Sequence, residues 1–81
     1  MTFDELVAAL RKVEGLRDKG KVHPNFHFRS KRFLHFHSAD GVAYAHVRFG
    51  DDFEHVAAAT DAERRVLFDR VAEHVAATRR S

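Results

Sequence analysis

The feature that most constrains the fold is a change in hydrophobic period along the chain. Apolar side chains recur at helical spacing near the N-terminus and again after residue 60. Between them, residues 25–49 alternate apolar and polar side chains with a period of two. A period of two gives a strand one apolar face, whereas helical spacing gives a helix one apolar stripe. The chain therefore predicts a central group of strands with a helix at each end.

Local signals set the boundaries of these elements. Thr2 and Glu5 form one capping-box pattern, and Thr60 and Glu63 form another, so helices are expected at about residues 3–14 and from residue 60 onward. Asp40-Gly41 is a two-residue hairpin signal within the alternating region. Residues 29–32 form a polar turn, residues 16–24 are expected to be a loop, and residues 53–59 are ambiguous.

The fold class that follows is α+β, as a single domain over residues 1–81. The element order is helix, three antiparallel strands, helix, and a short fourth strand at residues 53–58 is an alternative. Both helices are expected on the apolar face of the sheet, which leaves the other face open. The predicted core residues are Leu10, Phe26, Phe28, Leu34, Phe36, Val47, Phe49, Leu67 and Val71.

Histidines fall on the open face. A two-residue loop at residues 40–41 pairs His35 with His46 and His37 with Tyr44. A three-residue loop at residues 30–32 places His27 opposite His35 and keeps every apolar side chain on the buried face, which a one-residue slip would not do. The sequence therefore predicts a row of His27, His35 and His46 with His37 beside it.

One interpretation of this row is a zinc site. Imidazole nitrogens bind zinc at ~2.0–2.1 Å, and His35, His37 and His46 would supply three ligands, with His27 as a fourth or a substitute. No carboxylate lies nearby in sequence, and the surroundings are cationic, which disfavours a dication. The other interpretation is solvated histidines with no cofactor, and the sequence leaves both open.

A second interpretation is an anionic partner such as nucleic acid. Residues 11–48 hold nine Lys or Arg against three Asp or Glu, a local charge of +6, although the whole chain has a net charge of only +2. Basic and aromatic side chains interleaved on one face suit phosphates and stacked bases. The candidate residues are Arg29, Lys31, Arg32, Phe33, Tyr44 and Arg48.

A third interpretation is self-association. Phe33, Val42 and Tyr44 are expected to be exposed on the open face, where a second copy would cover them in a homodimer. The function predicted from the sequence is thus a non-enzymatic binding module that uses the open face, with a second copy or an anionic partner. Histidine-based zinc binding is the alternative.

Other classes are disfavoured. The chain has no cysteine, which excludes disulfides and thiolate chemistry and fits a cytoplasmic protein. Its apolar runs are too short to span a bilayer, and no signal peptide is expected at its acidic N-terminus. No nucleophile motif or phosphate-binding glycine loop is present, so an enzyme is not favoured.

Overall fold

The computed structural model describes residues 1–81 and contains two helices and five strands. In chain order they are α1 (Phe3–Arg11), β1 (Leu16–Asp18), β2 (Asn25–Phe28), β3 (Lys31–Ala39), β4 (Val42–Val47), β5 (Glu54–Ala57) and α2 (Asp61–Arg80). Neither helix is both long enough and apolar enough to cross a membrane.

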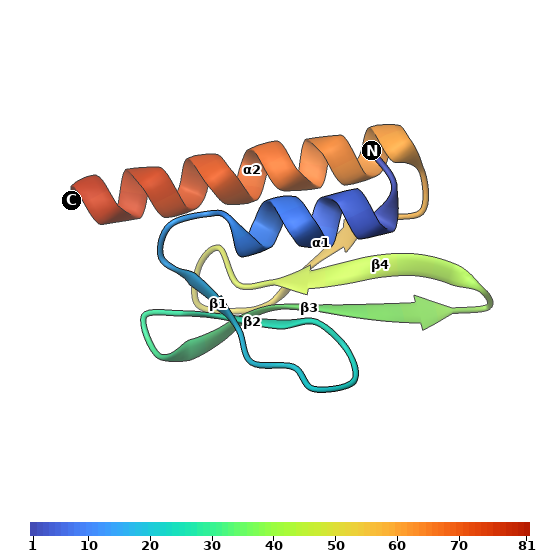
Figure 1. Ribbon diagram of the computed structural model, residues 1–81, viewed down its shortest axis with the longest axis horizontal. Coiled ribbons are helices and arrows are strands. Elements are labelled where there is room, and N and C mark those ends of the chain that lie inside the picture. The colour runs from blue at the N-terminus through green and yellow to red at the C-terminus, as the bar shows by residue number, and fades with distance from the viewer.

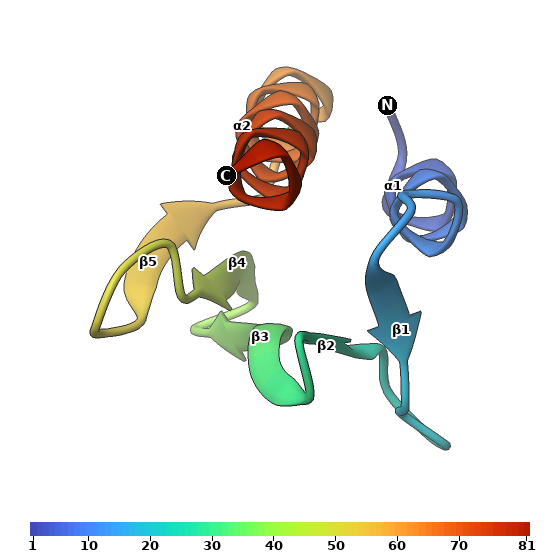
Figure 2. The same ribbon diagram turned by 90° about the vertical axis from the view of Figure 1, so that its left-hand side faces the viewer.

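The strands form one antiparallel sheet in the order β1-β2-β3-β4-β5. Both helices lie on the same side of this curved sheet, with α1 over β1 and α2 toward β5 (Figures 1 and 2). The predicted α+β class is confirmed, but the sheet has five strands rather than three. The fourth-strand alternative is realised as β5, whereas the expected loop at residues 16–24 begins with strand β1.

Both helices begin where the sequence predicts. The Thr2 hydroxyl accepts a hydrogen bond from the Glu5 amide at 3.1 Å, and the Glu5 carboxylate accepts one from the Thr2 amide at 2.7 Å. Thr60 and Glu63 repeat this arrangement in α2. Each capping box satisfies amides that the first helical turn leaves without partners. Helix α1 ends at Arg11, earlier than the sequence suggested.

One hydrophobic core joins the helices to the sheet. Six of the predicted core residues are buried: Leu10, Phe26, Leu34, Val47, Leu67 and Val71. The other three, Phe28, Phe36 and Phe49, are half-buried and pack against the edge of the core. Phe36 lies under α1, where its ring meets that of Phe3 edge-on at 5.0 Å between centroids. The alternation therefore identified the buried face correctly.

The β2–β3 hairpin differs from the predicted register. Its loop has two residues, Arg29 and Ser30, both with positive φ (54° and 66°), and Phe28 is opposite Lys31. Two left-handed residues in a tight turn match the twist of the flanking strands. Phe26 is nevertheless opposite Leu34, because a β-bulge inserts one extra residue into β3. The predicted three-residue loop is therefore wrong. The bulge, and not a longer loop, keeps the apolar side chains of β2 and β3 on the same face of the sheet.

The bulge places Phe33 in the core. Phe33 is 3% exposed and neighbours Leu34, which is fully buried, so two consecutive residues of β3 face the helices. The Phe33 ring contacts Phe28 and Phe49 edge-on. The prediction that Phe33 is exposed on the open face is therefore wrong, and its ring is not available for stacking with a base.

Candidate metal centre

The β3–β4 hairpin builds the central part of the open face. Asp40 and Gly41 both have positive φ, as a two-residue hairpin turn of this kind requires. The turn places His35 opposite His46 and His37 opposite Tyr44, which confirms the predicted register. Side chains directly opposite one another project from the same face. His35 and His37 share that face because they are two residues apart on one strand.

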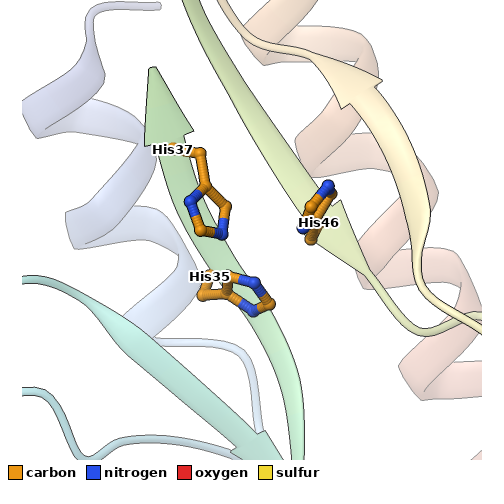
Figure 3. Close-up of side chains that lie close together, drawn as sticks. All are labelled: His35, His37 and His46. Carbon is orange, nitrogen blue, oxygen red and sulfur yellow. The ribbon is translucent and has the colours of Figure 1, made fainter. Parts of the chain in front are cut away.

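Three histidines converge on this face. One ring nitrogen from each of His35, His37 and His46 lies within 4.8 Å of the others. The ring centroids are 4.5 Å apart for His35–His37, 4.8 Å for His37–His46 and 5.2 Å for His35–His46. Figure 3 shows the three rings grouped between β3 and β4. Tetrahedral zinc with ~2.0–2.1 Å bonds needs nitrogens ~3.3 Å apart, so side-chain rotation has to close a gap of at most about 1.5 Å.

Two of the three imidazoles, those of His35 and His46, have lowered pKa values. Burial lowers the pKa of His35 from its ordinary value, and the neighbouring His37, His46 and Arg32 lower it further. Burial also lowers the pKa of His46, with added repulsion from His37 and His55. A neutral imidazole has a free lone pair, which is the form that binds a metal. The lowered pKa values of His35 and His46 therefore favour the form that can coordinate a metal.

Aromatic side chains frame the three histidines. Tyr44 stacks on His37 with ring centroids 5.5 Å apart and an interplanar angle of 21°. Phe53 lies 5.2 Å from the His35 ring and 6.4 Å from the His46 ring. The Arg48 guanidinium lies over the Phe53 ring, with its carbon 4.9 Å from the ring centroid. Neighbouring rings of this kind limit the rotamers open to the imidazoles. Phe53 lies in a segment whose conformation is ambiguous from the sequence, so its part in this surface is not predicted.

His55 also belongs to this surface. It lies opposite His46 in the β4–β5 ladder, with their ring centroids 5.2 Å apart, and its ring is 3.8 Å from that of Tyr44. The conformation of residues 53–59 is ambiguous from the sequence, so His55 is not predicted to lie on this surface. The alternation of buried Val56 and Ala58 with exposed His55 and Ala57 is the signal that places it on the open face.

His27 does not join the cluster. The bulge places it opposite Arg32 on β3, and on its other side it is opposite Arg17 of β1. The position opposite His35 is taken by Asn25 instead. The predicted adjacency of His27 and His35 is therefore wrong, and the row across the sheet reads Asn25, His35, His46, His55.

The residues expected to bind an anion are divided between two surfaces. The Arg29 guanidinium donates a hydrogen bond to the Thr78 carbonyl at the end of α2, at 3.0 Å. Lys31 is opposite Phe28, so it shares the helix-facing side of the sheet. Arg32 is opposite His27, and Arg48 covers Phe53; both therefore remain with Tyr44 on the open face.

Comparisons with known proteins leave the site to be interpreted from its geometry. No protein-family model matches the chain, and neither a curated protein nor a solved structure matches it.

Proposed function

We propose that the protein binds a divalent transition-metal ion, zinc in the first instance, through His35, His37 and His46. The observation that carries this proposal is the convergence of three imidazole nitrogens within 4.8 Å on a sheet face. Two adjacent strands hold the three side chains, so the ligand positions are largely organised before a metal arrives. Organisation of this kind lowers the cost of binding.

The donor set selects the class of metal. Three imidazoles suit zinc, copper or nickel, whereas calcium and magnesium require oxygen ligands. Glu54, the acidic residue of β5, pairs with Arg70 of α2 on the helix side and is not part of the cluster. Zinc is favoured because three protein ligands with a fourth, open position are a common zinc arrangement. A water molecule or another ligand would complete the coordination.

A single-stranded nucleic-acid interface receives less support from the geometry. Its expected stacking residue Phe33 is buried, and Arg29 and Lys31 lie away from Tyr44. Self-association through the open face remains a prediction, with Val42 55% exposed at its edge. Sedimentation of the metal-free protein measures it, and substitution of Tyr44 by Glu should prevent it.

Titration with zinc tests the proposed site. Tag-free protein is first treated with a chelator, since an affinity tag of histidines would bind zinc itself. One equivalent of zinc should bind, and thermal stability should rise because the ion prefers the folded state. His35→Gln, His37→Gln and His46→Gln should each weaken binding more than about a hundredfold, beyond the ~10–100-fold effect of outer-shell partners.

His27→Gln is the matched control, since His27 shares the open face but is opposite Arg32 and lies outside the cluster. It should leave zinc affinity unchanged. Binding that is lost equally in His27→Gln, or that survives all three cluster substitutions, contradicts the proposed site.

A further inference from the structure

A polar hollow of about 410 Å³ lies beside the histidine cluster and shares His35 with it. The residues that line it with polar side chains are Lys19, Lys21, His23, Asn25, Arg32 and His35. Pro24 and Phe36 supply the carbon surface, and Gly20 completes the lining. This volume falls within the range of small-molecule sites, and the hollow is shallow and open to solvent, with charged side chains along its lining.

The hollow carries uncompensated positive charge. None of Lys19, Lys21 and Arg32 forms a salt bridge, and no carboxylate lines the hollow. Other cations of the protein, such as Arg17, Lys31 and Arg80, also lack a carboxylate partner, so what distinguishes the hollow is that three such cations line one depression. Clustered cations without partners attract anions.

The loop that forms one wall is held in place by Asp18. One carboxylate oxygen of Asp18 accepts hydrogen bonds from the amides of Gly20 and Asn25, at 3.0 and 3.1 Å, and the other accepts one from Arg11 at 3.0 Å. A Cβ on Gly20 would lie 1.7 Å from the His23 carbonyl oxygen, so only glycine fits this tight turn. The Asp18 charge is thus neutralised, and the loop presents Lys19 and Lys21 on a fixed backbone.

Two neighbouring polar side chains in the lining have unused hydrogen-bonding capacity. Neither Oδ1 of Asn25 nor Nδ1 of His35 has a hydrogen-bond partner within the protein. They are opposite one another on β2 and β3. Both atoms are screened from solvent, and Oδ1 of Asn25 accepts hydrogen bonds as an oxyanion does, so recognition of an anion in the hollow falls to the three unpaired cations.

We infer that this hollow binds a small oxyanion, such as a phosphorylated or carboxylated metabolite. Arg32 provides a planar guanidinium for two oxygens of the anion, and Lys19 and Lys21 provide point charges. Anion binding at these three cations does not require the metal, so this inference goes beyond the proposed function.

The site also couples to the proposed metal centre. Arg32 and His35 both line the hollow, so the guanidinium and a metal held by His35 would lie near one another. The two positive charges would repel each other, and an oxyanion between them would reduce that repulsion. Anion and metal should therefore strengthen each other's binding, and the coupling must be equal in both directions. This coupling, unlike anion binding itself, rests on the proposed function.

Heteronuclear NMR of the metal-free protein at pH 7.5, titrated with inorganic phosphate and separately with malonate, tests the anion site. Saturable shifts are expected at the amides of residues 19–23, Asn25 and Arg32, with chloride as the control for ionic strength. A stronger response to phosphate identifies a phosphoryl ligand, and a stronger response to malonate identifies a carboxylate. Shifts that never saturate, or that spread over all surface lysines, overturn the inference.

Arg32→Gln and Lys31→Gln are a matched pair on one strand, because each removes one charge but only Arg32 lines the hollow. Arg32→Gln should weaken anion binding about tenfold, as expected for a charge-assisted hydrogen bond. Lys31→Gln should leave it within about twofold, since an exposed charge outside the hollow contributes little. Equal losses of anion affinity in both variants would show that the anion responds to the general positive charge of the surface, which overturns the proposed site.

Zinc titration in sulfate and in chloride at equal ionic strength tests the coupling. Sulfate should increase zinc affinity in the wild type and not in Arg32→Gln. Phosphate or malonate binding without any zinc binding rejects the proposed metal function but leaves the anion site standing. Zinc binding without phosphate or malonate binding rejects the anion site but leaves the proposed metal function standing.

Discussion

Phe33 on β3 and His74 on α2 stack face to face, with ring centroids 5.7 Å apart and an interplanar angle of 14°. His74 also meets Phe28 and Phe49 edge-on, at 6.5 and 5.3 Å. The bulge in β3 therefore turns an aromatic residue away from the open face and uses it to fix the sheet against α2. Phe33 thus has a structural role in the core.

Phe33→Ala should reduce the free energy of unfolding by about 3–5 kcal/mol, because it removes a buried ring and leaves a cavity. Denaturant unfolding measures this loss. Phe53→Ala is the comparison, since Phe53 is a half-buried ring on the open face. Its cost should be clearly smaller. Equal costs would show that the bulge does not place Phe33 in the core as described.

The Asp18 carboxylate should make the stability of the protein depend on pH in the acid range. Partial burial raises the pKa of this carboxyl, but the amides of Asn25 and Gly20 and the Arg11 guanidinium outweigh burial, so the pKa is lowered overall. The unfolded state then binds the proton more tightly. The stabilisation is present above the unfolded pKa of about 3.9 and is lost as pH falls through the lower folded value.

Asp18→Asn should therefore destabilise the protein by about 1–3 kcal/mol at pH 7, because it weakens hydrogen bonds to a charged group. The difference from wild type should narrow as the pH falls below about 4. Asp51→Asn, in an exposed turn without a salt bridge, should change little. Thermal melts across this pH range decide the matter, and a constant difference would contradict the assigned role.

Removal of His55 should raise the pKa of His46. Burial is the main cause of the lowered pKa of His46, followed by repulsion from His37 and His55. Loss of one neighbouring cation favours the protonated form, so His55→Gln should shift the His46 titration to higher pH without restoring the ordinary value. Histidine NMR measures the shift. An unchanged or lower pKa would show that the two rings are not coupled across β4 and β5.

As the pH falls, the zinc affinity of this cluster should decline less than that of a site built from histidines with ordinary pKa values. Protons compete with zinc for imidazole nitrogen, and lowered pKa values in His35 and His46 reduce that competition. We expect zinc binding to persist below pH 6.5 and then to fall steeply. Calorimetric titration from pH 8 to pH 5 measures this profile, and a decline that begins well above pH 7 would contradict it.

The sequence predicts the β3–β4 hairpin well, because the turn and the alternation around it agree. His35 therefore lies opposite His46, and His37 opposite Tyr44. The predicted β2–β3 register is wrong because a bulge shifts which residues of β3 face the helices, and no glycine or proline in the sequence marks its position. His27 was consequently placed beside His35, and Phe33 was placed on the wrong face.

The edge strands were harder to predict for a different reason. Strand β1 has only three residues, too few to show alternation, and its pairing with β2 depends on the tertiary position of the loop held by Asp18. Strand β5 contributes His55 and has only four residues. Short edge strands derive their conformation from their neighbours, so local sequence specifies them weakly.

The most direct test of the metal centre is a crystal structure of the zinc-loaded, tag-free protein with anomalous data collected at the zinc edge. A single anomalous peak should lie on the open face, about 2.0–2.1 Å from one nitrogen of each of His35, His37 and His46. Zinc that is absent from this face, or that is bound by His23 or the N-terminal amine instead, would contradict the proposed function.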